Sequence, residues 1–303
     1  MPRVSVGMPV FNCERFVAQS IESILGQTYG DFELVISDNA SSDHSEEVCR
    51  DYARRDARIR YVRQARNLGG PANFRHVFEI GGGEFQKWTT ADDYWDTTFI
   101  EKAIRVLDEH PDVVLCYPKT RFVDERGTLV GDYDDNLHLL EPSPRDRFLR
   151  LLETIGLCHA DVGVIRRSAM RRTRLMTEER SCDVHFVAEL SLYGKFWVLP
   201  EPLYYRRLHA DASSWNLADE ASQRRYYDPT GRHGPGMQSW RKYARLSGAV
   251  LRGPATWAEK GAMLAHLGRR MAWDRTELSR DLAARIGWRP SRPRRSEPPA
   301  ASS

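Results

Sequence analysis

The feature that most constrains the fold of this chain is a regular alternation, in its first third, of short apolar runs with segments of helical periodicity. Strands are predicted at residues 4–10, 32–37, 59–62 and 85–89. Helices are predicted between them at residues 17–25, 45–54 and 72–80. Strands that alternate with amphipathic helices are typical of a parallel sheet covered on its faces. The sequence therefore predicts an α/β fold with a mostly parallel sheet flanked by helices.

Each predicted strand ends in a polar or turn-forming cluster. These clusters lie at residues 9–12, 38–43, 67–71 and 90–93. Because ligands of open parallel sheets bind at the carboxyl ends of the strands, we expect the clusters to converge at one edge of the sheet.

The rest of the chain continues the pattern less regularly. Helices are predicted at 99–110, 146–155 and 183–192, and strands at 113–117, 162–166 and 196–199. Residues 238–286 are helical in pattern and predict two packed helices. We expect one catalytic domain over 1–215, with residues 1–115 and 116–215 as its two parts, and a helical extension over 216–287. Residues 288–303, which are rich in proline and arginine, predict a disordered, solvated tail, or alternatively an arm for an anionic partner.

The charge balance excludes a protein that binds nucleic acid through its overall field. The chain of 303 residues has 45 basic and 42 acidic residues, a net charge of +3. Five scattered cysteines show no metal-ligand spacing and fit reduced thiols. Neither a signal peptide nor a membrane span is recognisable. We therefore expect a cytoplasmic protein with at most peripheral association with the inner face of the membrane.

Two adjacent carboxylates, Asp92 and Asp93, directly follow the strand at 85–89. Adjacent carboxylates at a strand end can hold a divalent cation that offsets the charge of a diphosphate group. Alternatively, they cap the helix that follows, because aspartate is favoured at helix starts. A further aspartate at a strand end, Asp38, favours the first interpretation.

The four clusters together resemble the opening of the family 2 glycosyltransferases, which have the GT-A fold. The segments that carry the resemblance are Pro-Val-Phe-Asn at 9–12, Ser-Asp-Asn-Ala-Ser-Ser-Asp at 37–43, Asn-Leu-Gly at 67–69 and Trp-Thr-Thr-Ala-Asp-Asp at 88–93. Each segment alone is a weak signal, but four in the family's order are a strong one. The match covers roughly residues 3 to 120.

The resemblance implies a site for a nucleotide-sugar donor. Pro9, Phe11 and Asn12 would line the nucleotide pocket. Asp38 would accept hydrogen bonds from uracil or another base, and Asn67 with Gly69 would shape the base and ribose region.

The resemblance also implies a metal cofactor, Mg²⁺ or Mn²⁺. Asp92 would coordinate the ion between the two phosphates, and Asp93 would support the metal or contact the donor sugar. The family's pattern commonly has an acid where this chain has Thr90. The hydroxyl of Thr90 can bond a ribose or a metal-bound water but brings no charge, so a lower metal affinity is expected.

A catalytic base is implied by Ser-Cys-Asp-Val-His at 181–185, which resembles the acidic segment of the inverting members. Asp183 would accept the proton of the acceptor hydroxyl. Its alternative role is to cap the helix at 183–192, and the nearest rival for the base is the pair Glu178–Glu179.

A final segment, Tyr205 to Ser214, resembles the loop with arginine and histidine that follows the last sheet strand in this family. His209 would complete the metal shell through a neutral imidazole nitrogen, and Arg206 or Arg207 would bind the diphosphate.

These implications add up to an inverting transfer of a hexose-type sugar from a nucleotide donor, of which a UDP-sugar is favoured. The acceptor would be a sugar, a lipid-linked molecule or a natural product. A sugar nucleotidyltransferase would need a glycine-rich basic loop after the first strand, which residues 8–12 lack. A catalytically silent protein that binds nucleotide sugars remains the alternative, because of Thr90.

Overall fold

The computed structural model describes residues 1–210, 212, 220–229, 231 and 237–285. A nine-stranded sheet forms its centre, in the order β3-β2-β1-β4-β8-β6-β9-β5, with β7 paired to β6. The strands are β1 (Val4–Val10), β2 (Phe32–Asp38), β3 (Ile59–Arg63), β4 (Phe85–Trp88), β5 (Tyr94–Trp95), β6 (Val113–Val123), β7 (Leu129–Tyr133), β8 (Val164–Arg166) and β9 (Lys195–Arg207). The pairings make β1, β2, β3, β4, β6 and β9 run in one direction, so the predicted α/β fold with a mostly parallel sheet is confirmed.

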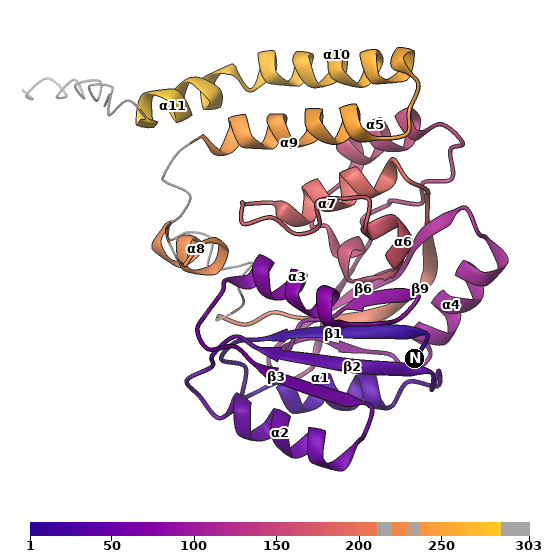
Figure 1. Cartoon of the computed structure of the whole chain (residues 1–303), viewed down its shortest axis with the longest axis vertical. Helices are drawn as coiled ribbons and strands as arrows, with labels where there is room; N and C mark the ends of the chain where they lie inside the picture. The colour runs from indigo at the N-terminus through magenta and orange to yellow at the C-terminus, as the bar shows by residue number, and fades with distance from the viewer. Residues whose placement is uncertain (211, 213–219, 230, 232–236, 286–303) are drawn as a thin grey trace, which may run out of the picture.

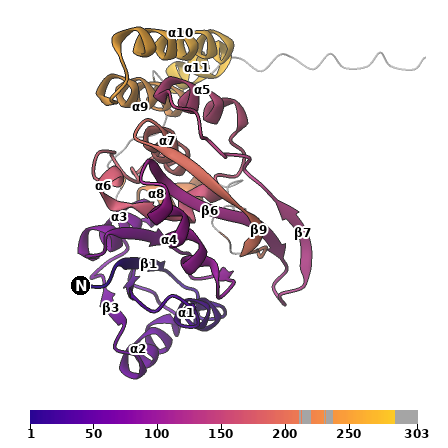
Figure 2. The same ribbon diagram turned by 90° about the vertical axis from the view of Figure 1, so that its right-hand side faces the viewer.

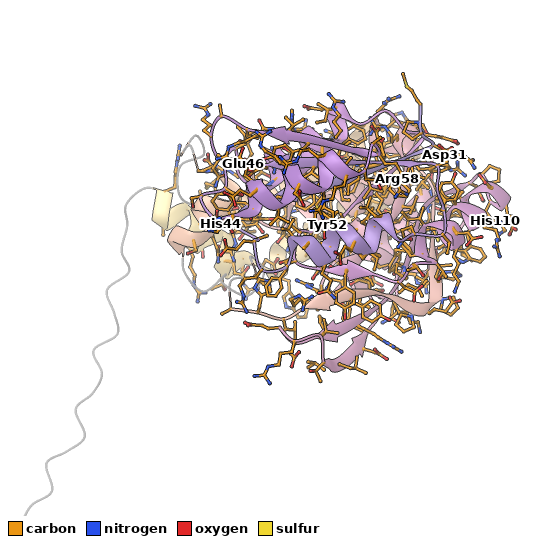
Figure 3. The ribbon with its side chains drawn as sticks, turned by 90° about the horizontal axis from the view of Figure 1, so that it is seen from below. Asp31, His44, Glu46, Tyr52, Arg58 and His110 are labelled. Carbon is orange, nitrogen blue, oxygen red and sulfur yellow. The ribbon has the colours of Figure 1, made fainter. Side chains whose placement is uncertain are left out.

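Helices cover both faces of the sheet (Figure 1). The first half contributes α1 (Val17–Leu25), α2 (Ser45–Arg55), α3 (Gly70–Ile80) and α4 (Phe99–Glu109). The second half contributes α5 (Pro144–Thr154), the 3-10 turn η1 (His159–Val162), α6 (Arg167–Met170), α7 (Cys182–Ser191) and α8 (Glu220–Tyr227). Figure 3 shows α1 and α2 side by side on one face, with Glu46 and Tyr52 on α2.

Strand alternation divides the core into two layers. On β2, the buried side chains of Leu34 and Ile36 pack with α1 and α4, whereas Val35 packs with α3 on the other face. Successive side chains of a strand point to opposite faces, so an all-apolar strand serves both cores. Gly7 of β1 lets α3 approach closely, because a Cβ atom there would lie 2.6 Å from Val77.

Residues 238–285 form three helices, so the prediction of two packed helices at 238–286 was wrong. They are α9 (Gln238–Arg252), α10 (Trp257–Trp273) and α11 (Arg275–Arg285), stacked beyond α5 and α7 (Figures 1 and 2). The Gly253–Pro254 pair ends the first helix, because proline cannot donate the next helical hydrogen bond. A capping box between Thr256 and Glu259 starts the second. The predicted tail at 288–303 lies outside the described residues.

Two strands of the second half are longer than predicted, whereas the strand predicted at 162–166 is shorter and spans only Val164–Arg166. The strand at 113–117 continues to Val123, and the strand at 196–199 continues to Arg207. The loop predicted to begin at Tyr205 therefore begins later than predicted. Tyr205, Arg206 and Arg207 are the last residues of β9, and His209 lies two residues beyond the strand. The domain boundaries stay a prediction.

Candidate active site

A cavity of about 890 Å³ opens where β1, β2, β3 and β4 end. Of the predicted site residues, the following line it: Pro9, Phe11, Asn12, Asn67, Thr90, Asp92 and His209. Five others do not contribute to its described wall: Asp38, Gly69, Asp93, Arg206 and Asp183. The predicted convergence of strand-end clusters at one edge is thus present.

The loop after β1 is bonded to the loop after β2. The backbone N–H of Asn12 donates to Oγ of Ser41 at 3.0 Å, and its side-chain Oδ1 accepts from the N–H of Ser42 at 2.8 Å. Asn12 has a φ of 50°, a conformation that asparagine tolerates better than most residues. Phe11 beside it is 45% exposed, which leaves its ring available at the cavity wall.

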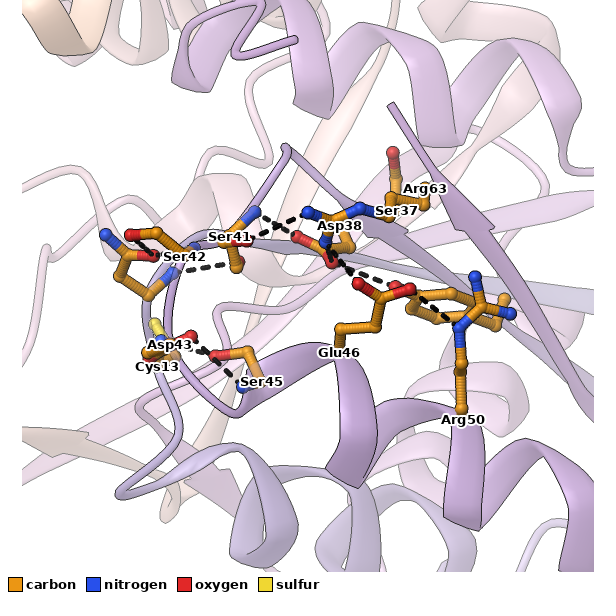
Figure 4. Close-up of polar contacts among 12 residues, drawn as sticks. Cys13, Ser37, Asp38, Ser41, Ser42, Asp43, Ser45, Glu46, Arg50 and Arg63 are labelled. Carbon is orange, nitrogen blue, oxygen red and sulfur yellow. Dashed lines mark hydrogen bonds and ion pairs between the residues drawn. The ribbon is translucent and has the colours of Figure 1, made fainter. Parts of the chain in front are cut away.

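Asp38 is fully buried and does not line the cavity. Figure 4 shows its polar contacts. Its carboxylate accepts hydrogen bonds from the backbone N–H of Ser41 at 2.8 Å, the hydroxyl of Tyr61 at 2.8 Å and the guanidinium of Arg63 at 2.5 Å. These internal donors bind the carboxylate oxygens of Asp38 that were predicted to contact a nucleobase. The contact with a nucleobase remains a prediction, and in the structure the carboxylate of Asp38 stabilises the loop after β2.

Asn39, which the sequence analysis did not select, lines the cavity next to Asp38. Its Nδ2 donates to Oδ1 of Asn67 at 2.9 Å, and its Oδ1 accepts from the N–H of Leu68 at 2.7 Å. The two asparagines therefore hold the loops after β2 and β3 together. A side-chain amide directly after a buried strand was the signal for Asn39.

The acidic turn brings Asp92 to His209. Oδ2 of Asp92 lies 3.0 Å from Nε2 of His209, and the side chains are 21% and 5% exposed. Burial acts to raise the pKa of Asp92, but the hydrogen bond and charge of His209 outweigh it and the pKa is lowered. Asp92 thus keeps its negative charge at the cavity wall.

Asp93 points away from the cavity and ties the turn to β9. It accepts hydrogen bonds from the hydroxyl of Thr90 at 2.6 Å, from the backbone N–H of Arg207 at 2.7 Å and from the hydroxyl of Tyr204. Burial, together with the charge of Asp92, raises the pKa of Asp93 to about 6. Asp93 therefore stabilises the acidic turn, and the hydroxyl of Thr90 supplies one of its hydrogen bonds.

Arg206 and Arg207 leave β9 on opposite faces. The guanidinium of Arg207 is bound internally: Nε donates to the carbonyl of Asp92 at 3.0 Å, and Nη2 donates to Oε1 of Gln19 at 2.5 Å. Its carbon centre lies 4.5 Å from the ring centre of Phe16. Arg206 instead contacts the ring of His159. Neither guanidinium lines the described cavity, so a diphosphate contact by Arg206 stays a prediction.

Asp183 lies in the first turn of α7, within a second acidic group formed with Asp161 and Asp135. Burial is the main cause that raises the pKa of Asp183, and the neighbouring charge of Asp135 adds to it while Arg206 opposes it. Burial and the charge of Asp183 raise the pKa of Asp161 well above its usual value. Asp161 was not predicted as a site residue, because the sequence shows it only as an acid among apolar residues.

The rivals of Asp183 are held in ion pairs. Glu178 lies 3.1 Å from the guanidinium of Arg75, and Glu179 accepts two hydrogen bonds of 2.9 Å from Arg245. These pairs connect the segment before α7 to α3 and α9. They give both glutamates a structural explanation.

Side chains connect the two acidic groups. Tyr204 donates to Asp93, and its ring meets the edge of the His159 ring at a centroid distance of 5.6 Å. Nδ1 of His159 lies 2.8 Å from the hydroxyl of Thr120, and Arg206 contacts the other ring nitrogen. The charge of Arg206 also acts on Asp161 and Asp183, so polar side chains lead from the acidic turn toward the Asp183 group.

Helix α8, which lies within the predicted helical extension at 216–287 but before the helical pattern at 238–286, lies along the cavity. Gln223 and Tyr226 contribute to the wall, together with Asn73 and Phe74 of α3. The two helices meet at Gly70, where a Cβ atom would lie 2.4 Å from the ring of Tyr226. The position of α8 was not predicted, because residues 220–227 do not form a long apolar pattern of helical periodicity.

A divalent cation fits the chemistry of the wall. Among the residues that the structure describes, no group of three or more histidine, cysteine, aspartate or glutamate side chains is arranged to hold a metal by itself. Asp92 and His209 bring one oxygen and one nitrogen donor to the same point of the cavity. Two protein ligands suit Mg²⁺ or Mn²⁺ when substrate oxygens and water supply the others.

Comparison with solved structures shows the type of fold. S. aureus TarS in complex with UDP-GlcNAc superposes with a TM-score of 0.67 at 18% identity, covering 94% of this chain and 78% of that one. The mannosyltransferase PcManGT of Pyrobaculum calidifontis, in complex with GDP-Man and Mn²⁺, gives a TM-score of 0.54 at 16% identity over 95% and 87% of the two chains. The fold is therefore that of the GT-A nucleotide-sugar glycosyltransferases.

The family follows from the sequence itself. The model of glycosyl transferase family 2 matches residues 5–174, and the chain belongs to this family of glycosyltransferases. The uncharacterized glycosyltransferase EpsJ of Bacillus subtilis is 27% identical over 191 residues, which cover 62% of this chain and 54% of EpsJ. The chain spans about half the length of the curated relatives it matches. No helix in the described part of the chain is both long enough and apolar enough to cross a membrane.

Proposed function

We propose that the chain is an inverting glycosyltransferase that moves a hexose-type sugar from a nucleoside diphosphate donor to an acceptor hydroxyl. The observation that carries the proposal is the Asp92–His209 pair on the wall of the strand-end cavity. The fold neighbours TarS and PcManGT, which hold UDP-GlcNAc and GDP-Man, support a nucleotide-sugar donor. We favour a UDP-sugar.

The donor nucleotide occupies the cavity between the loops after β1, β2 and β3. Phe11 offers an exposed ring to the base, and the Nδ2 groups of Asn12 and Asn67 offer hydrogen-bond donors to the base and ribose. Asp38 and Gly69 shape this region from behind the wall. The diphosphate then reaches Thr90 and Asp92 at the end of β4.

Asp92 and His209 would hold a divalent cation, Mg²⁺ or Mn²⁺, at the wall of the cavity. When bound, the cation offsets the negative charge that grows on the leaving diphosphate. Asp93 keeps the turn in place through Thr90 and Tyr204. PcManGT, which holds Mn²⁺ beside GDP-Man, supports this use of a metal.

Asp183 acts as the base. The acceptor oxygen attacks the anomeric carbon from the side opposite the diphosphate, the bond from that carbon to the diphosphate breaks, and Asp183 takes the hydroxyl proton. The raised pKa of Asp183, caused mainly by burial, makes its carboxylate a stronger base than an exposed aspartate. Attack from the opposite side inverts the anomeric configuration.

The acceptor is a sugar, a lipid-linked molecule or a natural product with a free hydroxyl. The part of the chain after residue 115, which contains Asp135, Asp161 and Asp183, would bind this acceptor. The five cysteines are all free, which supports a reducing compartment, and we propose a cytoplasmic location at the inner face of the membrane.

The alternative is a catalytically silent protein that binds nucleotide sugars, suggested by the neutral Thr90. A thermal-shift screen of nucleotide sugars with Mn²⁺, followed by donor turnover with the best ligand, separates the two. The proposal expects one donor to raise Tm in the presence of Mn²⁺ and then to be consumed. Stabilisation by a donor that is neither hydrolysed nor transferred to any acceptor would establish the silent alternative.

A further inference from the structure

Helix α10 exposes an apolar surface, contrary to the usual pattern of a surface helix. We define the outer face of α10 as its exposed residues Trp257, Ala258, Gly261, Ala265, Gly268, Arg269, Ala272 and Trp273. Trp257 is 79% exposed and Trp273 is 87% exposed. Arg269 is the only charged side chain on this face. A solvated helix normally places its charged residues there.

The opposite face of α10 already packs on the protein. Met263 and Leu267 are buried against the core that α9 and α5 share. The helix lies at the outer edge of the molecule in both views (Figures 1 and 2). The outer face is therefore not needed to hold α10 in place. The indoles of Trp257 and Trp273 are exposed to solvent at its two ends.

The helices around this face are strongly basic. Residues 238–285 contain ten arginines and lysines and four acidic residues, a net charge of +6 in a chain whose total is +3. Arg269, Arg275 and Arg280 are exposed at the end of α10 and along α11. At the other end, the ammonium of Lys260 lies 4.9 Å from the ring centre of Trp257.

We infer that the outer face of α10 docks the protein on an anionic lipid membrane surface. Indoles flanked by basic side chains suit the boundary between headgroups and acyl chains, where the ring is buried and the cation meets phosphate. The small residues between the indoles let the helix lie close to the bilayer plane. Basic side chains add attraction to anionic lipids.

A second copy of the chain fits this face less well. Two such faces would bring net charges of +6 toward each other, and like charges at close range oppose association. An anionic surface reverses the sign of that interaction. The inference does not depend on the chemistry proposed for the cavity, since it uses no residue of the site.

The test is flotation of the full chain with vesicles of pure phosphatidylcholine or of phosphatidylcholine with phosphatidylglycerol. We expect binding to the anionic vesicles that weakens with added salt. The double variant W257S/W273S and the single variant Arg269→Glu should each lower the partition coefficient by about tenfold or more. These side chains are exposed, so an unchanged thermal melt is expected for both variants.

The matched control removes two exposed apolar side chains elsewhere. Leu129 and Val130 of β7 are 57% and 59% exposed, and L129S/V130S should bind vesicles like the unaltered chain. The inference is overturned if the unaltered chain does not bind anionic vesicles, or if W257S/W273S binds as well as the control. A concentration-dependent dimer in sedimentation that W257S/W273S abolishes would overturn it in favour of a second copy.

Discussion

Nε2 of His209 lies 3.0 Å from Oδ2 of Asp92, although the two residues are 117 positions apart in the chain. The contact depends on β5, whose two residues pair with Tyr204 and Tyr205 of β9. This pairing carries the end of β9 back to the acidic turn after β4. The proposed metal site is thus built by the second half of the sheet as much as by the first.

Asp183→Asn should abolish the base without disturbing the cavity. We expect kcat to fall by about 10²–10⁴-fold, the usual contribution of a general base. The affinity for the donor nucleotide should stay unchanged, because Asp183 does not line the cavity. Single-turnover transfer and nucleotide titration measure the two effects.

Glu178→Gln is the control for this prediction, since Glu178 precedes the same helix and pairs with Arg75 at 3.1 Å. It should retain transfer. A loss of transfer in Glu178→Gln with full activity in Asp183→Asn would show that the base has been misassigned.

The stability of the fold should fall in acid because His159 is buried neutral. Burial, with Arg206 adding to it, lowers the pKa of His159 from 6.5 to about 2. Below pH 6.5 the unfolded chain binds a proton at this residue that the folded chain does not, so stability is lost progressively as pH falls. Between pH 6.5 and 5.0 the loss from this group is about 2 kcal/mol.

The measurement is urea unfolding at several pH values in the unaltered chain and in His159→Gln. The variant should be less stable at pH 7.5, because it loses packing against Tyr204, but its curve should be flatter by about 2 kcal/mol over that interval. Parallel curves would show that His159 does not cause the acid sensitivity.

Gly69→Ala should displace the segment after α8 from the cavity. Gly69 has a φ of 90°, and a Cβ atom there would lie 2.9 Å from Pro229 and 3.0 Å from the carbonyl oxygen of Tyr226. Strain and clash together should cost about 1–3 kcal/mol. The affinity for the nucleotide should weaken together with the stability, because Tyr226 lines the cavity.

Gly30→Ala is the control, because no atom lies within 4 Å of a Cβ atom at Gly30. It should leave the free energy of unfolding and the nucleotide affinity unchanged, and equal effects of the two variants would refute the role given to Gly69.

Thr90→Asp tests why a neutral residue stands in the acidic turn. The hydroxyl of Thr90 donates to Asp93 at 2.6 Å, and a carboxylate there would face that acid. Without metal we expect a loss of about 1–2 kcal/mol of stability. Mn²⁺ should raise Tm more in this variant than in the unaltered chain, and an equal response would place the cation elsewhere.

The first half of the fold could be predicted because its signals are local. Apolar runs such as 4–10 and 32–37 end at turn-forming residues, and the structure has β1 and β2 there. The second half depends on pairing between distant residues. The strand β9 continues to Arg207, although a local pattern assigns this polar residue to a loop. Arg207 can be buried at the strand end because its guanidinium donates hydrogen bonds to Gln19 and to backbone carbonyl oxygens.

The same reason limits what could be predicted of the site. Residues directly after strands, such as Asn12 and Asp92, were selected and do line the cavity. Asp161 and Tyr226 were missed, since nothing in their neighbours shows that a turn or a helix brings them near the site. Asp38 was selected by its position, but only the structure shows that Tyr61 and Arg63 occupy its carboxylate.

The central claim is that Asp92 and His209 hold a cation that binds the donor diphosphate. Calorimetric titration of UDP with and without Mn²⁺ tests it directly in the unaltered chain, Asp92→Asn and His209→Gln. We expect Mn²⁺ to tighten UDP binding about tenfold or more in the unaltered chain and far less in either variant. An equal gain from Mn²⁺ in Asp92→Asn, or no gain in the unaltered chain, would contradict it.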